Sequence, residues 1–418
     1  MKNQETLFLG LDSSTQGLKC TLIDADLNLV YERSVNFDRD LPRFGTKGGV
    51  QVGPDGRTVT SPTLMWVAAM DLLLSQMHAD GAPLASVQAI SGSGQQHGSV
   101  WLGTNAQQRL RHLNAAETLE TQLADTFSIP DSPIWMDSST GAQCAAREKA
   151  LGGAQAVAEL TGSRAYERFT GNQIAKIYGK QPAAYAATER IALVSSFIPS
   201  LLIGTYAPID ASDGSGMNLM DIRRKAWAPA ALDCTAPGLV EKLGSIVASH
   251  TTIGTLHPYF SKRYGFAPSV SVIAFSGDNP NSLAGLRLQD PGDIAISLGT
   301  SDTVFGFLAD AKPSASEGHI FANPVSPSAY MAMLCYKNGS LTREFIRDLA
   351  ADGNWKVFAQ RLSETAPGNG GCIGFFIRDP EITPPILKTG VWRFDAKGQA
   401  VDRFSPAQDC RAVYEGQF

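Results

Sequence analysis

The same short pattern occurs twice in this chain: an apolar run, a turn rich in Gly, Ser and Thr, and a second apolar run. The first copy occupies residues 7–23, and the second occupies residues 294–308. Each copy is typical of a β-hairpin. A hairpin turn of this composition directs backbone N–H groups and hydroxyls toward one point, which allows a protein to hold phosphate without a helix-based P-loop. The repeat therefore predicts two related domains that grip a nucleotide.

Length, charge and cysteine usage limit the class of protein. At 418 residues the chain is too long for one ordinary core, so two domains are expected. The net charge of −5 disfavours nucleic acid or an anionic membrane as the main partner. The six cysteines include no Cys-x-x-Cys pair and no zinc spacing with histidine, so we expect reduced thiols and a cytoplasmic location. The apolar stretch 191–209 contains Pro and Gly, which favours a buried helix and its exit loop over a membrane span.

The order of the predicted elements indicates an α/β protein. An antiparallel meander is expected over residues 7–37, and alternating strands and helices follow it. The expected helices cover residues 63–77, 115–127, 139–150 and 341–351, with a further helix beginning at residue 281. The expected later strands cover residues 87–91, 270–275 and 330–335. Pro and Gly within residues 254–266 suggest a domain joint, and we expect domains at residues 1–262 and 263–418 that arose by remote duplication.

Asp12 stands where the first apolar strand meets its turn. A carboxylate at this position can hold Mg²⁺ through water, as metal-dependent phosphoryl transfer requires. The alternative is an ordinary hairpin turn with an Asx-type hydrogen bond. The second hairpin turn, Gly299–Thr300–Ser301, favours the functional interpretation.

The run Ser-Gly-Asp-Asn-Pro at residues 276–280 marks the end of a strand and the start of a helix. Asn279 is a good N-cap when Pro280 occupies the first helical position. Asp278 would then lie just outside a helix N-terminus, whose partial positive charge favours the ionised carboxylate. Such a carboxylate could accept the proton of a substrate hydroxyl, or it could only assist capping, and the local sequence leaves both open.

The Gly-rich loop at residues 91–98 follows a predicted strand. Its glycines are spaced one residue too far apart for a dinucleotide-binding fingerprint. Its polar side chains suit hydrogen bonds to a polyhydroxy ligand, although His97 could also be a satisfied loop histidine.

Three further side chains have a structural and a functional interpretation. Arg164 and Arg168 either bind a ligand or pair with a neighbouring acid such as Glu167. Trp355 follows a bend, where it could stack on a purine or pack in the core. The sequence contains no Walker A, zinc-protease or nucleophile-elbow motif, and residues 213–216 lack the acidic positions of an EF-hand loop.

Together these segments resemble the FGGY carbohydrate kinase family, and within it the animal-like xylulokinase branch. The matching segments are residues 10–16, 91–98, 135–140, 162–171, 213–218, 276–280 and 297–302. The likeness covers nearly all of the chain. The Gln-Gln-His-Gly run at residues 95–98 and the run at residues 164–169 are specific to that branch, whereas the hairpin turns are shared across sugar kinases.

The resemblance implies a fold of two ribonuclease-H-like domains, of the actin and hexokinase type, around a central cleft. It also implies ATP-dependent phosphorylation of D-xylulose to D-xylulose 5-phosphate, with Mg²⁺ as cofactor. The partners would be small molecules, the ketose and ATP, with no nucleic acid or membrane, and a homodimer stays open. The alternatives are a ribulose or glycerol kinase, a sugar-binding fragment without activity and, least favoured, an actin-like ATPase.

The family's site residues map onto matching positions of this chain. By resemblance, Asp278 is the general base and Asp12 holds the metal. The expected sugar contacts are Gln96, His97, Arg168, Asp278 and Asn279. The expected nucleotide and phosphate contacts are Ser13, Ser14, Thr15, Gly299, Thr300, Ser301 and Trp355.

Family members also continue beyond the position of Phe418, and their later segment supplies a Gly-Gly turn and an Asn for the adenine. Ser405 and Pro406 are expected to begin a last helix as N-cap and first helical residue. We therefore expect an incomplete second domain, with uncovered apolar surface and an incomplete adenine pocket.

Overall fold

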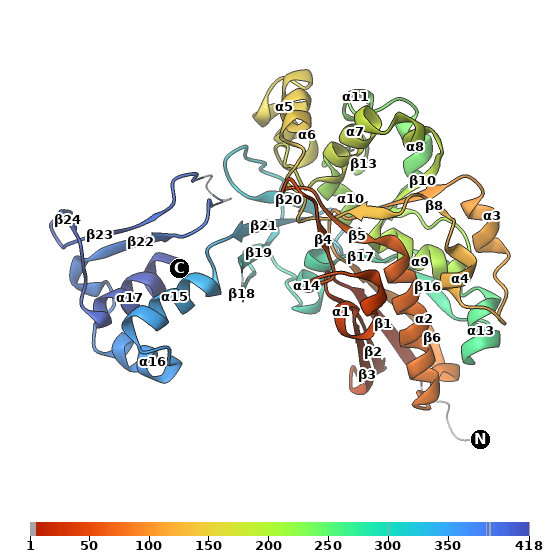
Figure 1. Cartoon of the computed structure of the whole chain (residues 1–418), viewed down its shortest axis with the longest axis horizontal. Helices are drawn as coiled ribbons and strands as arrows, with labels where there is room; N and C mark the ends of the chain where they lie inside the picture. Colours follow the sequence, from red (N-terminus) through yellow and green to blue (C-terminus); the bar gives the residue numbers. More distant parts are fainter. Residues whose placement is uncertain (1–5, 300, 382, 384–385, 418) are drawn as a thin grey trace. The chain divides into compact units, whose positions relative to one another are not determined.

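The structure is a computed structural model that describes residues 6–299, 301–381, 383 and 386–417. It comprises two compact units (Figure 1). The first unit contains Met1–Pro291, Phe307–Ala315 and Ile320–Met331. The second unit contains Gly292–Gly306, Ser316–His319 and Ala332–Phe418. Neither unit is one continuous stretch, because the chain passes from one unit to the other more than once.

The main sheet of the first unit has the strand order β15-β16-β6-β1-β2-β3, and β17 also pairs with β6. Strands β1, β2 and β3 form the predicted antiparallel meander, while β6, β16 and β17 run parallel to their neighbours β1 and β6. The bounds are β1 (Leu7–Ser13), β2 (Gly17–Asp24), β3 (Leu29–Asn36), β6 (Val87–Gly94), β15 (Thr252–Thr255), β16 (Ser271–Ile273) and β17 (Ser276–Gly277).

The core of the first unit lies against this sheet. Leu7, Leu9 and Leu11 alternate along β1 with less buried residues, as a strand with one buried face requires. Helix α2 (Thr63–Ala79) is buried around most of its circumference and carries the fully buried Trp66. The apolar residues of α2 therefore do not form one narrow stripe, which is typical of a helix enclosed by its neighbours.

The first unit contains further elements, and some of them form a second buried cluster that contains Ile174, Tyr185 and Leu243. The helices are α1 (Phe37–Asp40), α3 (Ala106–Arg111), α4 (Leu119–Leu123), α5 (Gly141–Ala150), α6 (Ala154–Thr161), α7 (Thr170–Lys180), α8 (Pro182–Ala186), α9 (Val194–Ile203), α10 (Ala211–Gly214), α11 (Pro229–Asp233), α12 (Leu239–Leu243), α13 (Pro258–Tyr264) and α14 (Asp278–Gly285). The short strands are β4 (Gln51–Val52), β5 (Val59–Pro62), β7 (Ser99–Gly103), β8 (Phe127–Ile129), β9 (Asp131–Pro133), β10 (Thr188–Leu193), β11 (Ile209–Asp210), β12 (Met220–Asp221), β13 (Ala226–Trp227) and β14 (Ile246–Val247).

The second hairpin belongs to a sheet with the strand order β18-β19-β21-β20. Its strands are β18 (Ile294–Leu298), β19 (Asp302–Leu308), β20 (His319–Ala322) and β21 (Tyr330–Tyr336). A second sheet contains β22 (Ile373–Ile377), β23 (Gly390–Phe394) and β24 (Ala400–Val401). Helices α15 (Ser340–Ala350), α16 (Trp355–Ser363) and α17 (Pro406–Gln417) enclose a small core that includes Ile346, Phe358 and Val413.

Both predicted hairpins are present, because β1 pairs antiparallel with β2 and β18 pairs antiparallel with β19. Ser405 and Pro406 begin α17 as predicted, and Ser405 Oγ accepts from the backbone N–H of Gln408 at 3.3 Å. The apolar side chains of Ile294, Ile296 and Leu298 are exposed in the second unit. Within the described residues, no helix combines the length and the hydropathy that spanning a membrane requires.

Two predicted segments differ in the structure. Residues 254–266, predicted as a joint, contain the end of β15 and the whole of α13, which buries Tyr259, Phe260 and Tyr264 in the core of the first unit. The helix predicted over residues 115–127 shrinks to α4, because Phe127 begins a strand that pairs with β7 and this pairing outweighed the local pattern. The proposed division after residue 262 stays a prediction, and residues 263–291 lie with the first unit.

Candidate active site

Three parallel strand ends bring the first two candidate acids together. Asp12 on β1 lies opposite Ser93 on β6, and Ser93 lies opposite Ser276 on β17. The hydroxyl Oγ of Ser93 donates to Asp12 Oδ1 at 2.7 Å. Because the carboxyl ends of parallel neighbours meet at one sheet edge, Asp12 and the residue after β17, Asp278, belong to the same site.

Asp278 is the first residue of α14, and Gly277 is the N-cap. The prediction that Asn279 caps this helix was wrong, because the chain turns into the helix two residues earlier than the Asn-Pro pair suggests. Asp278 Oδ1 accepts from the backbone N–H of Asn279 at 2.9 Å and from that of Gln96 at 3.3 Å. Burial, and then the negative charge of Asp12, raise the pKa of Asp278 to about 6.

Gln96 and Asn279 form one hydrogen-bonded amide pair beside Asp278. Asn279 Nδ2 donates to Gln96 Oε1 at 2.8 Å and to Asp278 Oδ1 at 3.2 Å. The Gly-rich loop after β6 and the start of α14 are therefore joined through both side-chain and backbone bonds.

His97 is held in one tautomer by its surroundings. Its ring stacks on Phe169 with a centroid distance of 4.5 Å, and Nδ1 lies 2.9 Å from the carbonyl oxygen of Gly216. A carbonyl only accepts, so Nδ1 carries the proton and Nε2 is the acceptor. Burial, and then the charge of Arg168, lower the pKa of His97 to about 3. The ring is therefore neutral at physiological pH and accepts one hydrogen bond through Nε2.

This depressed pKa predicts an acid sensitivity. As the pH falls from 6.5 toward 3, the unfolded chain protonates His97 while the folded chain does not, so the folded state loses stability. We expect about 2 kcal/mol of this loss at pH 4.5. His97→Asn removes the ring and suits the left-handed backbone at this position, where φ is 68°. Urea unfolding at pH 7 and pH 4.5 should show a smaller acid loss for the variant, and equal losses would contradict the assignment.

Arg168 lies beside the same aromatic group. Its guanidinium lies 5.2 Å from the ring centroid of Tyr166 and 5.8 Å from that of Phe169. Arg164 does not pair with Glu167, since its guanidinium lies 3.1 Å from a carboxylate oxygen of Glu148. The structure thus separates the two arginines: Arg164 forms an ion pair, and Arg168 reaches toward His97.

Most hydroxyls of the first hairpin turn already form hydrogen bonds within the protein. Ser14 donates through its backbone N–H and through Oγ to the Gly17 carbonyl, both at 3.0 Å. Thr15 Oγ1 accepts from Trp135 Nε1 at 2.8 Å. Ser13 Oγ is buried and has no partner in the part of the chain that the structure describes. Asp12 bonds to Ser93 rather than closing an Asx turn, which removes the structural alternative for this residue.

The other nucleotide candidates lie in the second unit, except Thr300, which lies outside the described residues. The Gly299 carbonyl accepts from the backbone N–H of Ser340 at 2.9 Å, so this turn contacts the start of α15. Trp355 is 46% exposed and packs against Phe358 and the guanidinium of Arg347. A core position for Trp355 is therefore wrong, and one face of its indole remains accessible.

Two buried aspartates behind the site had no predicted role. Asp210 Oδ2 accepts from Ser249 Oγ at 2.5 Å and from Ser276 Oγ at 3.0 Å. Asp213 Oδ2 accepts from Ser195 Oγ at 2.5 Å. Burial raises the pKa of both carboxyls. The Asp-Gly-Ser-Gly run after a short strand was the available signal, but only the fold brings it beside Asp278.

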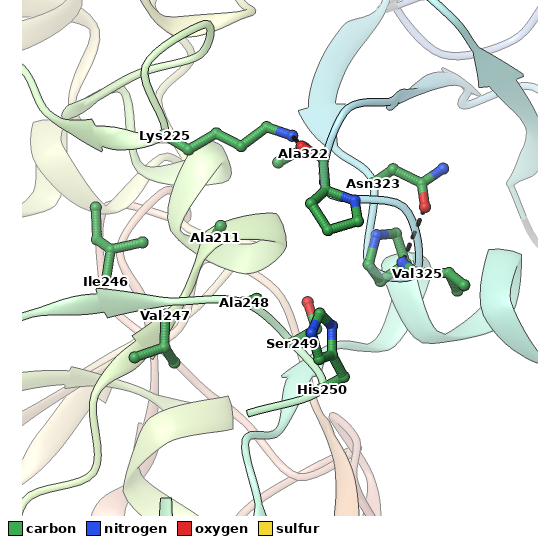
Figure 2. Close-up of a pocket in the computed structure, with 12 residues that line it drawn as sticks. Ala211, Lys225, Ile246, Val247, Ala248, Ser249, His250, Ala322, Asn323 and Val325 are labelled. Carbon is green, nitrogen blue, oxygen red and sulfur yellow. Dashed lines mark hydrogen bonds between the residues drawn. The ribbon is translucent and has the colours of Figure 1, made fainter. Parts of the chain in front are cut away.

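A separate pocket of about 190 Å³ is lined by Ala211, Ser249 and Asn323 among others (Figure 2). Its wall includes Ser249, whose hydroxyl donates to Asp210, together with His250 and Asn323. Lys225 crosses toward the same wall, where its Nζ donates to the carbonyls of Pro327 and Ala329. None of the predicted site residues lines this pocket.

Comparison with known proteins identifies the class. The model of the FGGY family of carbohydrate kinases, N-terminal domain, matches residues 128–285. The chain is 57% identical over 410 residues to "Xylulose kinase" of Mus musculus, covering 98% of this chain and 74% of the mouse protein. It is 51% identical over 427 residues to "Xylulose kinase 2" of Arabidopsis thaliana, covering 99% of this chain and 76% of that protein.

A solved structure titled "Crystal structure of a xyloylose kinase from Brucella ovis" matches with a TM-score of 0.81. The match covers 98% of this chain and 76% of that chain at 20% identity, so it establishes the fold alone. The chain belongs to the FGGY family of carbohydrate kinases. The predicted α/β fold of the actin and hexokinase type and the predicted class of enzyme, an ATP-dependent carbohydrate kinase, are confirmed.

Proposed function

We propose that the protein phosphorylates D-xylulose at its 5-hydroxyl with ATP. The observation that carries this proposal is one polar wall in the first unit. It joins Gln96, Asn279 and Asp278 through hydrogen bonds, beside the charge of Asp12, and His97 follows Gln96 in the same loop. The xylulose kinases among its relatives support the choice of sugar.

Asp278 is the proposed general base. Its hydrogen bonds with Gln96 and Asn279 all end on Oδ1, so Oδ2 is the oxygen assigned to take the hydroxyl proton. Its raised pKa makes the carboxylate a better proton acceptor than an ordinary aspartate while it stays ionised at neutral pH.

The other sugar contacts differ in hydrogen-bonding character. His97 Nε2 accepts a sugar hydroxyl, because Nδ1 already faces the Gly216 carbonyl. Arg168 only donates, so it suits a sugar carbonyl or hydroxyl oxygen. His97 accepts and Arg168 donates, and both lie against Phe169. Together they would select the orientation of a polyhydroxy ligand.

Asp12 is the proposed Mg²⁺ residue, and its surroundings fit this ion. No cluster of three or more acidic, His or Cys side chains suited to a metal occurs in the described residues. Mg²⁺ commonly takes one or two carboxylates and completes its shell with water and substrate phosphates. When bound, the ion would offset the negative charge of the transferring phosphoryl group.

The phosphate and nucleotide contacts are proposed on the hairpin geometry. Ser13, Ser14 and Thr15 are the proposed phosphate contacts of the first unit. Ser13 Oγ is the hydroxyl left without a partner in the described residues, whereas Ser14 already bonds to Gly17 through its N–H and its hydroxyl, and the Thr15 hydroxyl accepts from Trp135. Gly299, Thr300, Ser301 and Trp355 are the proposed nucleotide contacts. A cytoplasmic location is also proposed, and the cysteine spacing, which contains no Cys-x-x-Cys pair, supports it.

Substrate preference tests the proposal. We expect D-xylulose to be phosphorylated with a kcat/KM at least about tenfold above D-ribulose and glycerol, because a missing hydrogen bond to a buried polar group costs about 1–3 kcal/mol. ADP release from the three sugars, with calorimetric titration of D-xylulose, measures this. A preference for glycerol would overturn the choice of sugar. Sugar binding without turnover would instead indicate a binding protein.

A further inference from the structure

Asp213 is a buried carboxylate behind the proposed sugar site, and the proposed reaction leaves it without a role. It lies in α10, and the residue is 1% exposed. Ser195 Oγ holds Oδ2 at 2.5 Å, whereas Oδ1 has no hydrogen-bond partner among the described residues. A buried carboxylate oxygen without a donor costs stability, so its position calls for a reason.

Gln96 carries the complementary atom. The residue is 3% exposed, and its Nε2 is buried without a partner in the described part of the chain. The other end of the same amide, Oε1, accepts from Asn279 at 2.8 Å. One end of Gln96 is therefore bound to a sugar-site residue, and the other is a buried donor without an acceptor.

The two unpaired atoms lie around Gly277. A Cβ atom on Gly277 would lie 2.9 Å from Asp213 Oδ1 and 3.0 Å from Gln96 Cδ. The Gln96 amide and the Asp213 carboxylate therefore both border the space that a side chain at residue 277 would fill. Burial, and then the charges of Asp210 and Asp278, raise the pKa of Asp213, while hydrogen bonds from Ser195 and from the Gln96 amide act in the opposite direction.

We propose that Asp213 is a positioning residue: by accepting from Gln96 Nε2 it fixes the direction of the Gln96 amide, and thereby the orientation of Asn279 beside Asp278. This inference rests on the proposed function, because the sugar site contains Gln96 and Asn279 only under that proposal.

The resulting chain of bonds has a direction. An ionised carboxylate only accepts, so Gln96 turns Nε2 toward Asp213 and Oε1 toward Asn279. Asn279 must then present Nδ2 to Gln96 and Asp278, as observed, and its Oδ1 is the atom left for a sugar hydroxyl. Without an acceptor at residue 213, both amides can exchange their oxygen and nitrogen ends.

A double-mutant cycle on D-xylulose binding tests this at pH 8, because a higher pH shifts a carboxyl with a raised pKa toward its ionised form. We expect Asp213→Leu to weaken binding by about tenfold or more in the wild-type background, but by less than about twofold when Gln96→Met is already present. Asp71→Leu is the matched control, because Asp71 is a buried aspartate of α2 outside the site. The affinity of this variant for D-xylulose should be unchanged. Equal effects of Asp213→Leu in both backgrounds, or no effect in either, would overturn the inference.

A second set of variants keeps the side-chain shapes in case Asp213→Leu does not fold. Gln96→Glu places two carboxylates face to face and should weaken D-xylulose binding by about tenfold. Adding Asp213→Asn exchanges the amide and the carboxylate between the two positions and should restore most of that loss. Failure of the exchange to restore binding would count against the positioning role. Failure of the wild-type protein to bind D-xylulose would instead overturn the proposed function itself.

Discussion

Replacing Asp278 with Asn is expected to lower D-xylulose turnover by about 10²–10⁴-fold, the usual contribution of a general base. The amide oxygen can still accept the N–H groups of Gln96 and Asn279, which now bond to Asp278 Oδ1. The amide cannot take up the hydroxyl proton at neutral pH. Sugar affinity should therefore change far less than kcat, and ADP release with calorimetric titration of D-xylulose separates the two.

Asp71→Asn is the control for this substitution. Asp71 is also a buried aspartate with a raised pKa, and it accepts from the backbone N–H of Glu120 at 2.9 Å and from the hydroxyls of Tyr259 and Tyr264 at 3.2 Å. The Asp71→Asn variant should turn over D-xylulose at the wild-type rate per folded molecule. If Asp278→Asn retained near-normal turnover, the proton would have to go elsewhere, and Asp278 could not be the base.

Gly92→Ala is expected to destabilise the fold by about 3 kcal/mol, near the upper end for overpacking. A Cβ atom at this position would lie 2.1 Å from the Leu11 carbonyl oxygen and 2.6 Å from Phe275 Cε2. Leu11 is the pairing partner of Gly92, one residue before the Asp12 and Ser93 pair. Strand β1 must therefore move away from β6 at the site, and both urea unfolding and D-xylulose binding should record the change.

Gly10→Ala is the matched control on the same strand pair. A Cβ atom there would meet only the Thr21 carbonyl oxygen, at 3.7 Å, which is an ordinary contact. Its free energy of unfolding should lie within about 1 kcal/mol of the wild type. A Gly92→Ala protein as stable as Gly10→Ala would show that the two strands tolerate a wider separation than their pairing indicates.

The sequence predicted the features that depend on neighbouring residues. The apolar runs and the Gly-Ser-Thr turns between them were enough to identify both hairpins. The motif spacing also placed Asp278 at a strand end and His97 on a polar loop. Asp12 and Asp278 come together at one edge of the sheet because β1, β6 and β17 pair in parallel. Only the fold reveals this pairing.

The failures share a cause, which is contact between residues far apart in the chain. Asn279 was predicted as a cap because Asn-Pro is a common helix start, yet its side chain instead bonds to Gln96, 183 residues away. The Asp-Gly-Ser-Gly run at Asp213 was the available local signal, but it assigned no role, because the importance of Asp213 depends on Ser195, Gln96 and Gly277 from three other elements. The Trp135 bond to Thr15 spans 120 residues and was missed for the same reason.

The discontinuous first unit has a practical consequence for anyone who wishes to isolate it. A clone that ends at Pro291 would omit Ile320 and Ala322, whose backbone N–H groups donate to the Gly162 carbonyl at 2.9 Å and to Ser215 Oγ at 3.1 Å. It would also leave the ammonium of Lys225 without the carbonyls of Pro327 and Ala329. An isolated first unit must therefore also contain Phe307–Ala315 and Ile320–Met331, joined to residue 291 through designed linkers. No single truncation of the chain yields this unit intact.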